Sequence, residues 1–154
     1  PDGLVTGVQT CALPISGKST FFRERFFDTH VRINLDMLRT RNRERILMEA
    51  CLRAQQPFVV DNTNVLAAER AVYIAPARAS GFRVAGYFFA PDARGSIARN
   101  QAREANKAIP VAGVLGTLKR LEQPRFEEGF DSLYLVRAMP ERRFDVEEIQ
   151  RRSE

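Results

Sequence analysis

Short apolar runs alternate along this chain with longer stretches that mix apolar and polar residues. The short runs predict β-strands and the longer stretches predict helices. Their alternation is typical of an α/β domain built on a mainly parallel sheet. The predicted strands are residues 4–8, 31–34, 58–60, 82–89 and 133–136. The predicted helices are residues 18–27, 36–55, 65–80, 92–106 and 111–121.

Two of these elements carry further local signals. The run Phe58–Val60 is continuously apolar and is therefore predicted to be a buried central strand. The helix over 65–80 has Asn64 as its expected N-cap and Gly81 beyond its end. Pro76 is expected to kink or shorten that helix, because proline lacks the backbone N–H.

The composition fits one domain. The chain has 154 residues, of which 44% are hydrophobic and 28% charged, enough for one packed core and too few for two ordinary domains. No apolar run is long enough to cross a bilayer, and no segment resembles a secretory signal. Two cysteines alone form neither a disulfide scaffold nor a zinc site. We therefore expect a cytoplasmic protein without membrane contact.

The net charge of +5 comes from a chain in which all but three of the 24 basic residues are arginine. Arginine is favoured where a planar fork must grip phosphate or carboxylate. Most surface charges are nevertheless simply solvated, and arginine-rich chains are also typical of GC-rich coding sequences. The charge is compatible with a phosphate-bearing substrate and does not demonstrate one.

Residues Ser16, Gly17, Lys18, Ser19 and Thr20 form the second half of a Walker A phosphate loop. Gly17 lets the backbone approach the phosphates, and the amides that open the next helix point toward them. Lys18 is expected to reach the β- and γ-phosphates, and the Ser19 hydroxyl to complete a Mg²⁺ shell. The segment therefore predicts binding of ATP and Mg²⁺.

The first half of that loop departs from the Walker A pattern. Ala12 stands where the pattern has glycine, and Pro14 removes an amide donor. The stretch 5–15 resembles the translation of a sequencing-library adapter. We therefore interpret residues 1–15 as an artefactual leader, residues 16–140 as the domain, and 141–154 as a charged tail. We expect that tail to pack loosely, with Phe144 and Val146 available to anchor a final short strand.

A second constellation follows the strand Phe58–Val60. Asp61 stands directly after it, as in a Walker B segment, and is predicted to hold Mg²⁺ through the metal's water shell beside Ser19. Asn62 and Thr63 offer neutral polar groups for the substrate at the same rim. A strand followed by an Asx turn is the alternative interpretation.

A third constellation follows the strand over 31–34. Ligands collect beyond the carboxyl ends of strands in open α/β sheets. Asp36 can there accept a proton from a substrate hydroxyl, while Arg39, on the same helix face, holds an anionic group of that substrate. The alternative is that Asp36 caps the helix and Arg39 faces water.

A fourth constellation is the basic helix over 92–106. Arg99 and Arg103 are four residues apart and share one face, which Lys107 continues. Such a face can neutralise charge that develops on a transferred phosphoryl group. The alternative is a solvated basic face.

Taken in order, these motifs resemble the P-loop kinases related to the polynucleotide 5′-hydroxyl kinase domain, a group that includes bacterial AAA-type ATP-binding proteins. The resemblance covers residues 16–140. It implies a three-layer α/β P-loop NTPase fold with a five-stranded, mainly parallel sheet and a helical lid. It also implies Asp36 as general base, Arg39 as substrate clamp, Asp61 as Walker B carboxylate, and two lid arginines. The matching segments are SGKST at 16–20, NLDMLR at 34–39, VVDNTN at 59–64 and RNQAREANKAIP at 99–110.

The leading hypothesis is a kinase that transfers the γ-phosphoryl of Mg·ATP to a hydroxyl acceptor. Asp36, Lys18, Arg99 and Arg103 are its expected catalytic residues. A nucleic-acid 5′-hydroxyl and a small molecule both stay open as the acceptor, and no protein partner is identified. The alternatives are a nucleotide-binding switch or partner-binding module without phosphotransfer, and a chain made inactive by its altered loop.

Overall fold

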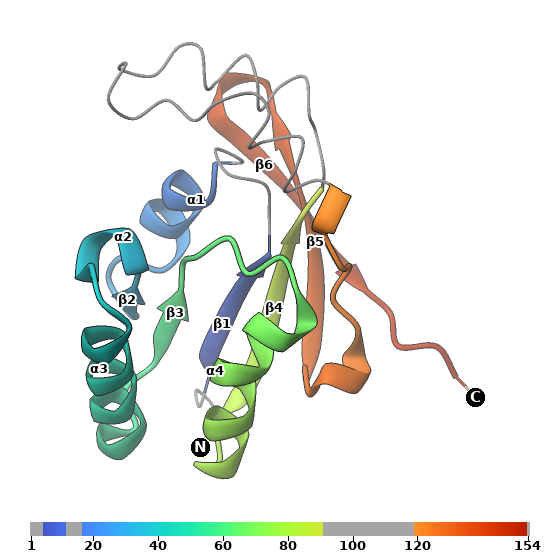
Figure 1. Ribbon diagram of the computed structural model, residues 1–154. Coiled ribbons are helices and arrows are strands. Elements are labelled where there is room, and N and C mark those ends of the chain that lie inside the picture. Colours follow the sequence, from blue (N-terminus) through green and yellow to red (C-terminus); the bar gives the residue numbers. More distant parts are fainter. Residues whose placement is uncertain (1–4, 12–16, 91–118, 154) are drawn as a thin grey trace.

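A computed structural model describes residues 5–11, 17–90 and 119–153 of the chain (Figure 1). The helix expected over 92–106, most of the helix over 111–121 and the predicted lid lie outside these residues. Ser16, Arg99 and Arg103 also lie outside them. For residues 5–11 the structure describes the backbone alone.

The described strands form one sheet in the order β2-β3-β1-β4-β5-β6. Five neighbouring strands run parallel, and β6 is antiparallel to β5. The sheet thus has one strand more than the resemblance implies. The strands are β1 Val5–Cys11, β2 Val31–Ile33, β3 Phe58–Val60, β4 Arg83–Phe89, β5 Ser132–Met139 and β6 Arg143–Ile149.

Both ends of the chain contribute to this sheet. Residues 5–11, which we interpreted as part of a leader, lie between β3 and β4 at the centre of the sheet. Residues 143–149, which we expected to pack loosely, pair with β5 along their whole length. The prediction of a loose tail was therefore wrong, because Phe144 and Val146 pack against buried apolar residues of the sheet and first helix.

The helices lie on both faces of the sheet and make it the middle of three layers (Figure 1). In β3, Phe58 and Val60 belong to the core that contains residues of α3 and α4. Val59 faces the other way and packs with Phe22 of α1. This alternation is what a strand buried on both faces requires. The helices are α1 Lys18–Arg25, α2 Leu35–Leu38, α3 Arg41–Ala54 and α4 Ala67–Ala79, with 3₁₀ turns η1 Phe126–Glu128 and η2 Pro140–Arg142.

The helix predicted over 36–55 is two helices. The backbone of Arg39 has a φ of 75°, which ends α2. The side chain of Thr40 then accepts a hydrogen bond from the backbone N–H of Arg43 and caps α3. Asp36 and Arg39 therefore do not share one continuous helix face.

The helix predicted over 65–80 is slightly shorter than expected. It begins at Ala67 with Leu66 as its N-cap, so Asn64 does not cap it. Pro76 lies in its last turn, and the helix ends at Ala79. Gly81 follows with a φ of 82°, in the left-handed region that favours glycine. None of the described helices is long and apolar enough to span a membrane.

The side chains of Leu133 and Phe130 pack over the backbone of Gly86 in β4. A Cβ atom at this position would lie 2.6 Å from the Leu133 side chain and 2.7 Å from the Phe130 ring. Gly86, Leu133 and Phe130 are all buried. Glycine therefore lets the ring and the leucine fill the space over the sheet.

Candidate functional site

The start of α1 combines a left-handed glycine with the first helical amides. Gly17 is the N-cap of α1 and has a φ of 92°, a conformation that strains other residues. A Cβ at Gly17 would also come within 3.3 Å of the Phe144 ring. Lys18 is the first residue of the helix, and Ser19 and Thr20 follow in its first turn. This is the geometry in which a helix N-terminus attracts an anion.

Asp61 follows β3 directly and is 2% exposed. The hydroxyl of Ser19, 42 residues away in the chain, donates a hydrogen bond to Oδ2 of Asp61 at 3.4 Å. The two oxygen groups predicted to share a metal ion are thus neighbours. Hydroxyl and carboxylate oxygens are the donors that Mg²⁺ prefers, so this pair fits that ion.

Arg32 of β2 binds to the same two side chains, and sequence reasoning missed it. Its Nε donates to Oδ2 of Asp61 at 2.8 Å, and its Nη2 lies 2.8 Å from the same oxygen. Nη2 also donates to Oγ of Ser19 at 3.2 Å. A signal was available, because an arginine between the apolar residues Val31 and Ile33 must turn its side chain to the α1 face of the sheet.

Two asparagines attach α2 to the end of β3. Asn34 caps the helix by accepting a hydrogen bond from the backbone N–H of Met37 at 2.9 Å, and its Nδ2 donates to the backbone oxygen of Asp61 at 2.6 Å. Oδ1 of Asn62 accepts from the backbone N–H of Leu35 at 2.9 Å. Asp36 lies on this short helix and is exposed. The position of Asp36 relative to Asp61 therefore depends on the side-chain amides of Asn34 and Asn62.

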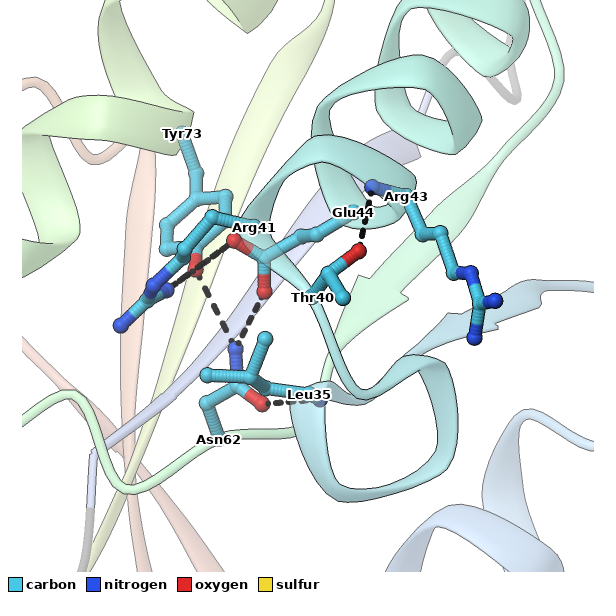
Figure 2. Close-up of polar contacts among 7 residues, drawn as sticks. All are labelled: Leu35, Thr40, Arg41, Arg43, Glu44, Asn62 and Tyr73. Carbon is cyan, nitrogen blue, oxygen red and sulfur yellow. Dashed lines mark hydrogen bonds and ion pairs between the residues drawn. The ribbon is translucent and has the colours of Figure 1, made fainter.

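The other end of the Asn62 amide is held by a buried polar cluster (Figure 2). Its Nδ2 donates to Oε2 of Glu44 at 3.0 Å and to Oη of Tyr73 at 3.2 Å. Tyr73 donates to Oε1 of Glu44 at 2.8 Å, and Nη1 of Arg41 donates to the same oxygen at 3.0 Å. Because Glu44 only accepts, the Asn62 nitrogen must face it and the Asn62 oxygen must face Leu35.

Burial is the main cause of an unusual ionisation in this cluster. It raises the pKa of Tyr73 to about 12, and the hydrogen bond to the Glu44 carboxylate adds to the increase. Tyr73 therefore stays protonated and remains a donor to Glu44 at any physiological pH. The cluster joins α3, α4 and the loop after β3.

A second buried pair fixes the rest of that loop. The guanidinium of Arg70 is fully buried, and its Nε and Nη2 donate to the two carboxylate oxygens of Glu128 at 2.7 and 3.0 Å. Its Nη1 donates to the backbone oxygen of Asn64 at 3.0 Å. Such a bidentate arrangement holds the turn at Asn64, whose φ is 41°.

The sequence of residues 39–127 matches the AAA domain family, over more than half of the chain. The chain belongs to the AAA domain family. The matched region contains Asp61 and the basic segment with Arg99 and Arg103. The start of α1 and Asp36 precede it.

Solved structures similar to this AAA domain include a gluconokinase from Sinorhizobium meliloti 1021, with a TM-score of 0.63 and 18% identity over 89% of this chain and 85% of that chain. Kti12 from Chaetomium thermophilum, solved with ADP-AlF3, has a TM-score of 0.62 and 15% identity over 84% and 88%. A chain of the PezAT toxin–antitoxin system of Streptococcus pneumoniae has a TM-score of 0.59 and 13% identity over 91% and 70%. At these identities the likeness concerns the fold, which is an α/β P-loop kinase-like fold.

The described part of this AAA domain brings some predicted site residues together and leaves others apart. Ser19 and Asp61 are in contact, and Gly17, Lys18 and Thr20 lie beside them at the start of α1. The predicted substrate residues differ among themselves, since Arg39 is exposed, Thr63 is half-buried, and the Asn62 amide holds neighbouring elements.

Among the side chains that the structure describes, within residues 17–90 and 119–153, no three His, Cys, Asp or Glu groups come together to hold a metal. A Mg²⁺ ion bound at Ser19 and Asp61 would depend on phosphate oxygens and water for its remaining ligands, as this ion usually does.

Proposed function

We infer that this chain binds Mg·ATP at the start of α1 and transfers the γ-phosphoryl group to a hydroxyl acceptor. The contact between Ser19 and the buried Asp61 carries the proposal. It joins a phosphate-loop hydroxyl to a strand-end carboxylate at the carboxyl edge of a parallel sheet, where ligands of such sheets bind. Membership in the AAA domain family supports the nucleotide-binding part of this function.

In the proposed reaction, the amides after Gly17 and the Lys18 ammonium would bind the phosphates. Ser19 and Asp61 would hold Mg²⁺, which neutralises phosphate charge when bound. Asp36 would accept the proton of the acceptor hydroxyl as that oxygen forms its bond to the γ-phosphorus and the bond to the β-phosphate oxygen breaks.

The remaining predicted residues would bind the acceptor or stabilise negative charge on the transferred phosphoryl group. Arg39 would bind an anionic group of the acceptor, with Asn62 and Thr63 beside it. Arg99 and Arg103 would stabilise charge on the transferred group. The acceptor is either a nucleic-acid 5′-hydroxyl or the hydroxyl of a small molecule, and the acceptor screen described below distinguishes the two.

Nucleotide binding is tested by calorimetric titration of the chain with ATP in the presence and absence of Mg²⁺. Lys18→Ala is expected to weaken ATP binding at least about tenfold, because it removes a charge-assisted contact. Asp61→Asn is expected to remove most of the Mg²⁺ dependence. Lys119→Ala, at an exposed lysine outside the Walker A segment, is the matched control. Equal affinities in all four proteins would contradict the proposed site.

The effect of the altered loop needs its own comparison. Ala12→Gly restores the glycine of the Walker A pattern and is expected to strengthen ATP binding. If only the Ala12→Gly protein binds ATP, the chain as it stands is inactive, as one alternative hypothesis holds. Neither protein binding ATP would reject the proposal.

Phosphotransfer is tested by ATP consumption with nucleosides, sugars and 5′-hydroxyl oligonucleotides as acceptors. Asp36→Asn is expected to abolish transfer while ATP binding is kept, because the amide cannot take a proton. Asp28→Asn, at another exposed aspartate, is the matched control. ATP binding without acceptor-dependent turnover would favour the nucleotide-binding switch.

A further inference from the structure

The Arg32 guanidinium lies at the predicted metal site. Its Nη2 contacts both groups that are expected to share a divalent cation, Oδ2 of Asp61 at 2.8 Å and Oγ of Ser19 at 3.2 Å. Its Nε donates to the same carboxylate oxygen at 2.8 Å. One positively charged group is therefore bound by both oxygen groups.

This arrangement follows from the burial of Asp61. The side chain is 2% exposed, and a carboxylate at such a position is costly unless a positive charge accompanies it. In β2, Arg32 is paired in register with Val59 of β3 and faces α1, which brings the guanidinium to the end of β3. The protein thus carries its own counter-ion for the carboxylate.

A divalent cation and the guanidinium would compete for the same oxygen atoms. Oδ2 of Asp61 and Oγ of Ser19 both accept hydrogen bonds from Arg32, so a metal and its water shell could use these two oxygens fully only if the hydrogen bonds from Arg32 are exchanged, whereas the Ser19 hydroxyl can keep its own hydrogen bond to Asp61. The Arg32 side chain is 29% exposed, and its Cζ lies 5.7 Å from the centre of the Phe22 ring. The guanidinium thus already lies over an aromatic ring, and the exposed part of the side chain gives it access to solvent, into which it can withdraw.

We propose that Arg32 acts as an internal competitor of the metal. It neutralises Asp61 in the metal-free protein and must withdraw from Asp61 and Ser19 when the divalent cation enters. Arg32 therefore weakens metal binding and prevents the buried carboxylate from being left uncompensated. The inference rests on the metal site of the proposed function.

The opposite role is physically distinct. If Arg32 stayed in place and oriented Asp61 toward the metal, its removal would weaken metal binding, as loss of an outer-sphere hydrogen bond does. The sign of the change in metal affinity therefore decides between competition and support.

The experiment titrates the full chain with Mn²⁺ alone and with Mn²⁺ and ADP, and measures free Mn²⁺ by electron paramagnetic resonance. Arg32→Gln is expected to bind Mn²⁺ about tenfold more tightly than the unsubstituted chain, the equivalent of one charge-assisted hydrogen bond. Arg23→Gln, at an exposed arginine of α1, is the matched control and is expected to be unchanged.

Equal or weaker Mn²⁺ binding by Arg32→Gln, with the unsubstituted chain still binding the metal, would overturn the inference and leave the proposed function intact. If the unsubstituted chain and Arg32→Gln both fail to bind Mn²⁺ with or without ADP, the metal site itself is rejected and the inference fails with it.

A measurement on the unsubstituted chain decides the question even if Arg32→Gln does not fold. The Nε–H resonance of Arg32, assigned by comparison with Arg32→Lys, is expected to exchange slowly with water before metal is added. Its exchange is expected to accelerate when Mg²⁺ and ADP bind. An Nε–H that stays protected in the metal-bound protein would overturn the inference.

Discussion

Tyr73 shows how a single hydroxyl can hold three elements together. Its Oη donates to Glu44 at 2.8 Å and accepts from Asn62 and Arg41 at 3.2 Å each. Tyr73 and Glu44 are both buried. A buried carboxylate that loses a donor keeps its desolvation cost, so this hydroxyl matters more than one at the surface.

We expect Tyr73→Phe to lower the free energy of unfolding by about 2 kcal/mol, the usual contribution of a hydrogen bond to a buried charged group. Urea denaturation measures this change. Tyr134→Phe, in a half-buried tyrosine of β5, is the control and is expected to change stability less. Equal losses of unfolding free energy in the two variants would show that the hydrogen bond from Tyr73 to Glu44 does not stabilise the fold.

His30 gives the chain a specific response to acid. Burial lowers the pKa of its imidazole from the ordinary value of 6.5. The imidazole ring and the Phe26 ring pack in an edge-to-face arrangement, with 5.0 Å between the ring centres. His30 is the sole histidine of the sequence, so its titration can be isolated by one substitution.

Because the unfolded chain binds a proton at His30 more readily than the folded chain, acid favours unfolding. The free energy of unfolding is expected to fall as the pH drops below 6.5 toward the lower pKa of the folded state, and His30 contributes no further change below that pKa. Urea denaturation from about pH 7.5 to 5.5 tests this. In His30→Gln this part of the pH dependence should disappear.

At the scale of single elements, the packing of Leu133 and Phe130 over Gly86 makes this position of β4 sensitive to any added side chain. Gly86→Ala would place a methyl group 2.6 Å from Leu133 and 2.7 Å from Phe130, so both side chains would have to move. We expect a loss of at least about 2 kcal/mol in thermal or urea unfolding, as overpacked cores show.

The matched test for Gly86 is a double-mutant cycle. Leu133→Ala alone should destabilise the sheet by leaving a cavity. In the Gly86→Ala background the same truncation removes one of the clashing groups, so the combined loss should be smaller than the sum of the two. A strictly additive pair would contradict the clash.

The elements differ in how well the sequence predicts them. The strand Phe58–Val60 has the bounds that the sequence predicts, because three consecutive apolar residues before Asp61 leave little choice. The break between α2 and α3 was missed, although Thr40 is a favoured N-cap residue. Residues 39–45 are all polar, so no apolar periodicity marks where one helix ends and the next begins, and the backbone reversal at Arg39 separates the two helices.

The residue types of the candidate site are predictable from the sequence, and several of its contacts are not. Walker-type spacing alone predicts that Ser19 and Asp61 lie at the same edge of the sheet. The contact of Arg32 with both depends on the register of β2 against β3 and on a side-chain rotamer, neither of which the sequence specifies. The engagement of Asn62 with Glu44 likewise depends on how α3 packs.

At the scale of the whole molecule, Phe144 connects the last strand to the first helix. Its ring packs edge-to-face against Phe21 with centres 5.2 Å apart and against Phe89 at 6.4 Å. It also lies against the backbone of Gly17, where an added Cβ would be 3.3 Å from it. A residue near the end of the sequence thus supports the turn that opens α1.

Phe144→Ala is expected to lower stability by about 2 kcal/mol, less than for a fully buried phenylalanine because the ring is half-buried. It is also expected to weaken nucleotide binding, since the support behind Gly17 is lost. Val146→Ala, in the same strand but with no ring near Gly17, should lower stability without the second effect. Urea denaturation and calorimetry separate the two quantities.

The last strand also determines what the sheet presents to other molecules. β6 covers the hydrogen-bonding edge of β5, and the exposed residues of β6 include Arg143, Asp145, Glu147 and Glu148. Charged side chains along an outer strand discourage edge-to-edge pairing between copies. A chain cut before Arg143 would expose the backbone of β5 next to Leu135 and Val136, and would be expected to aggregate through that strand even where the rest of the fold survives.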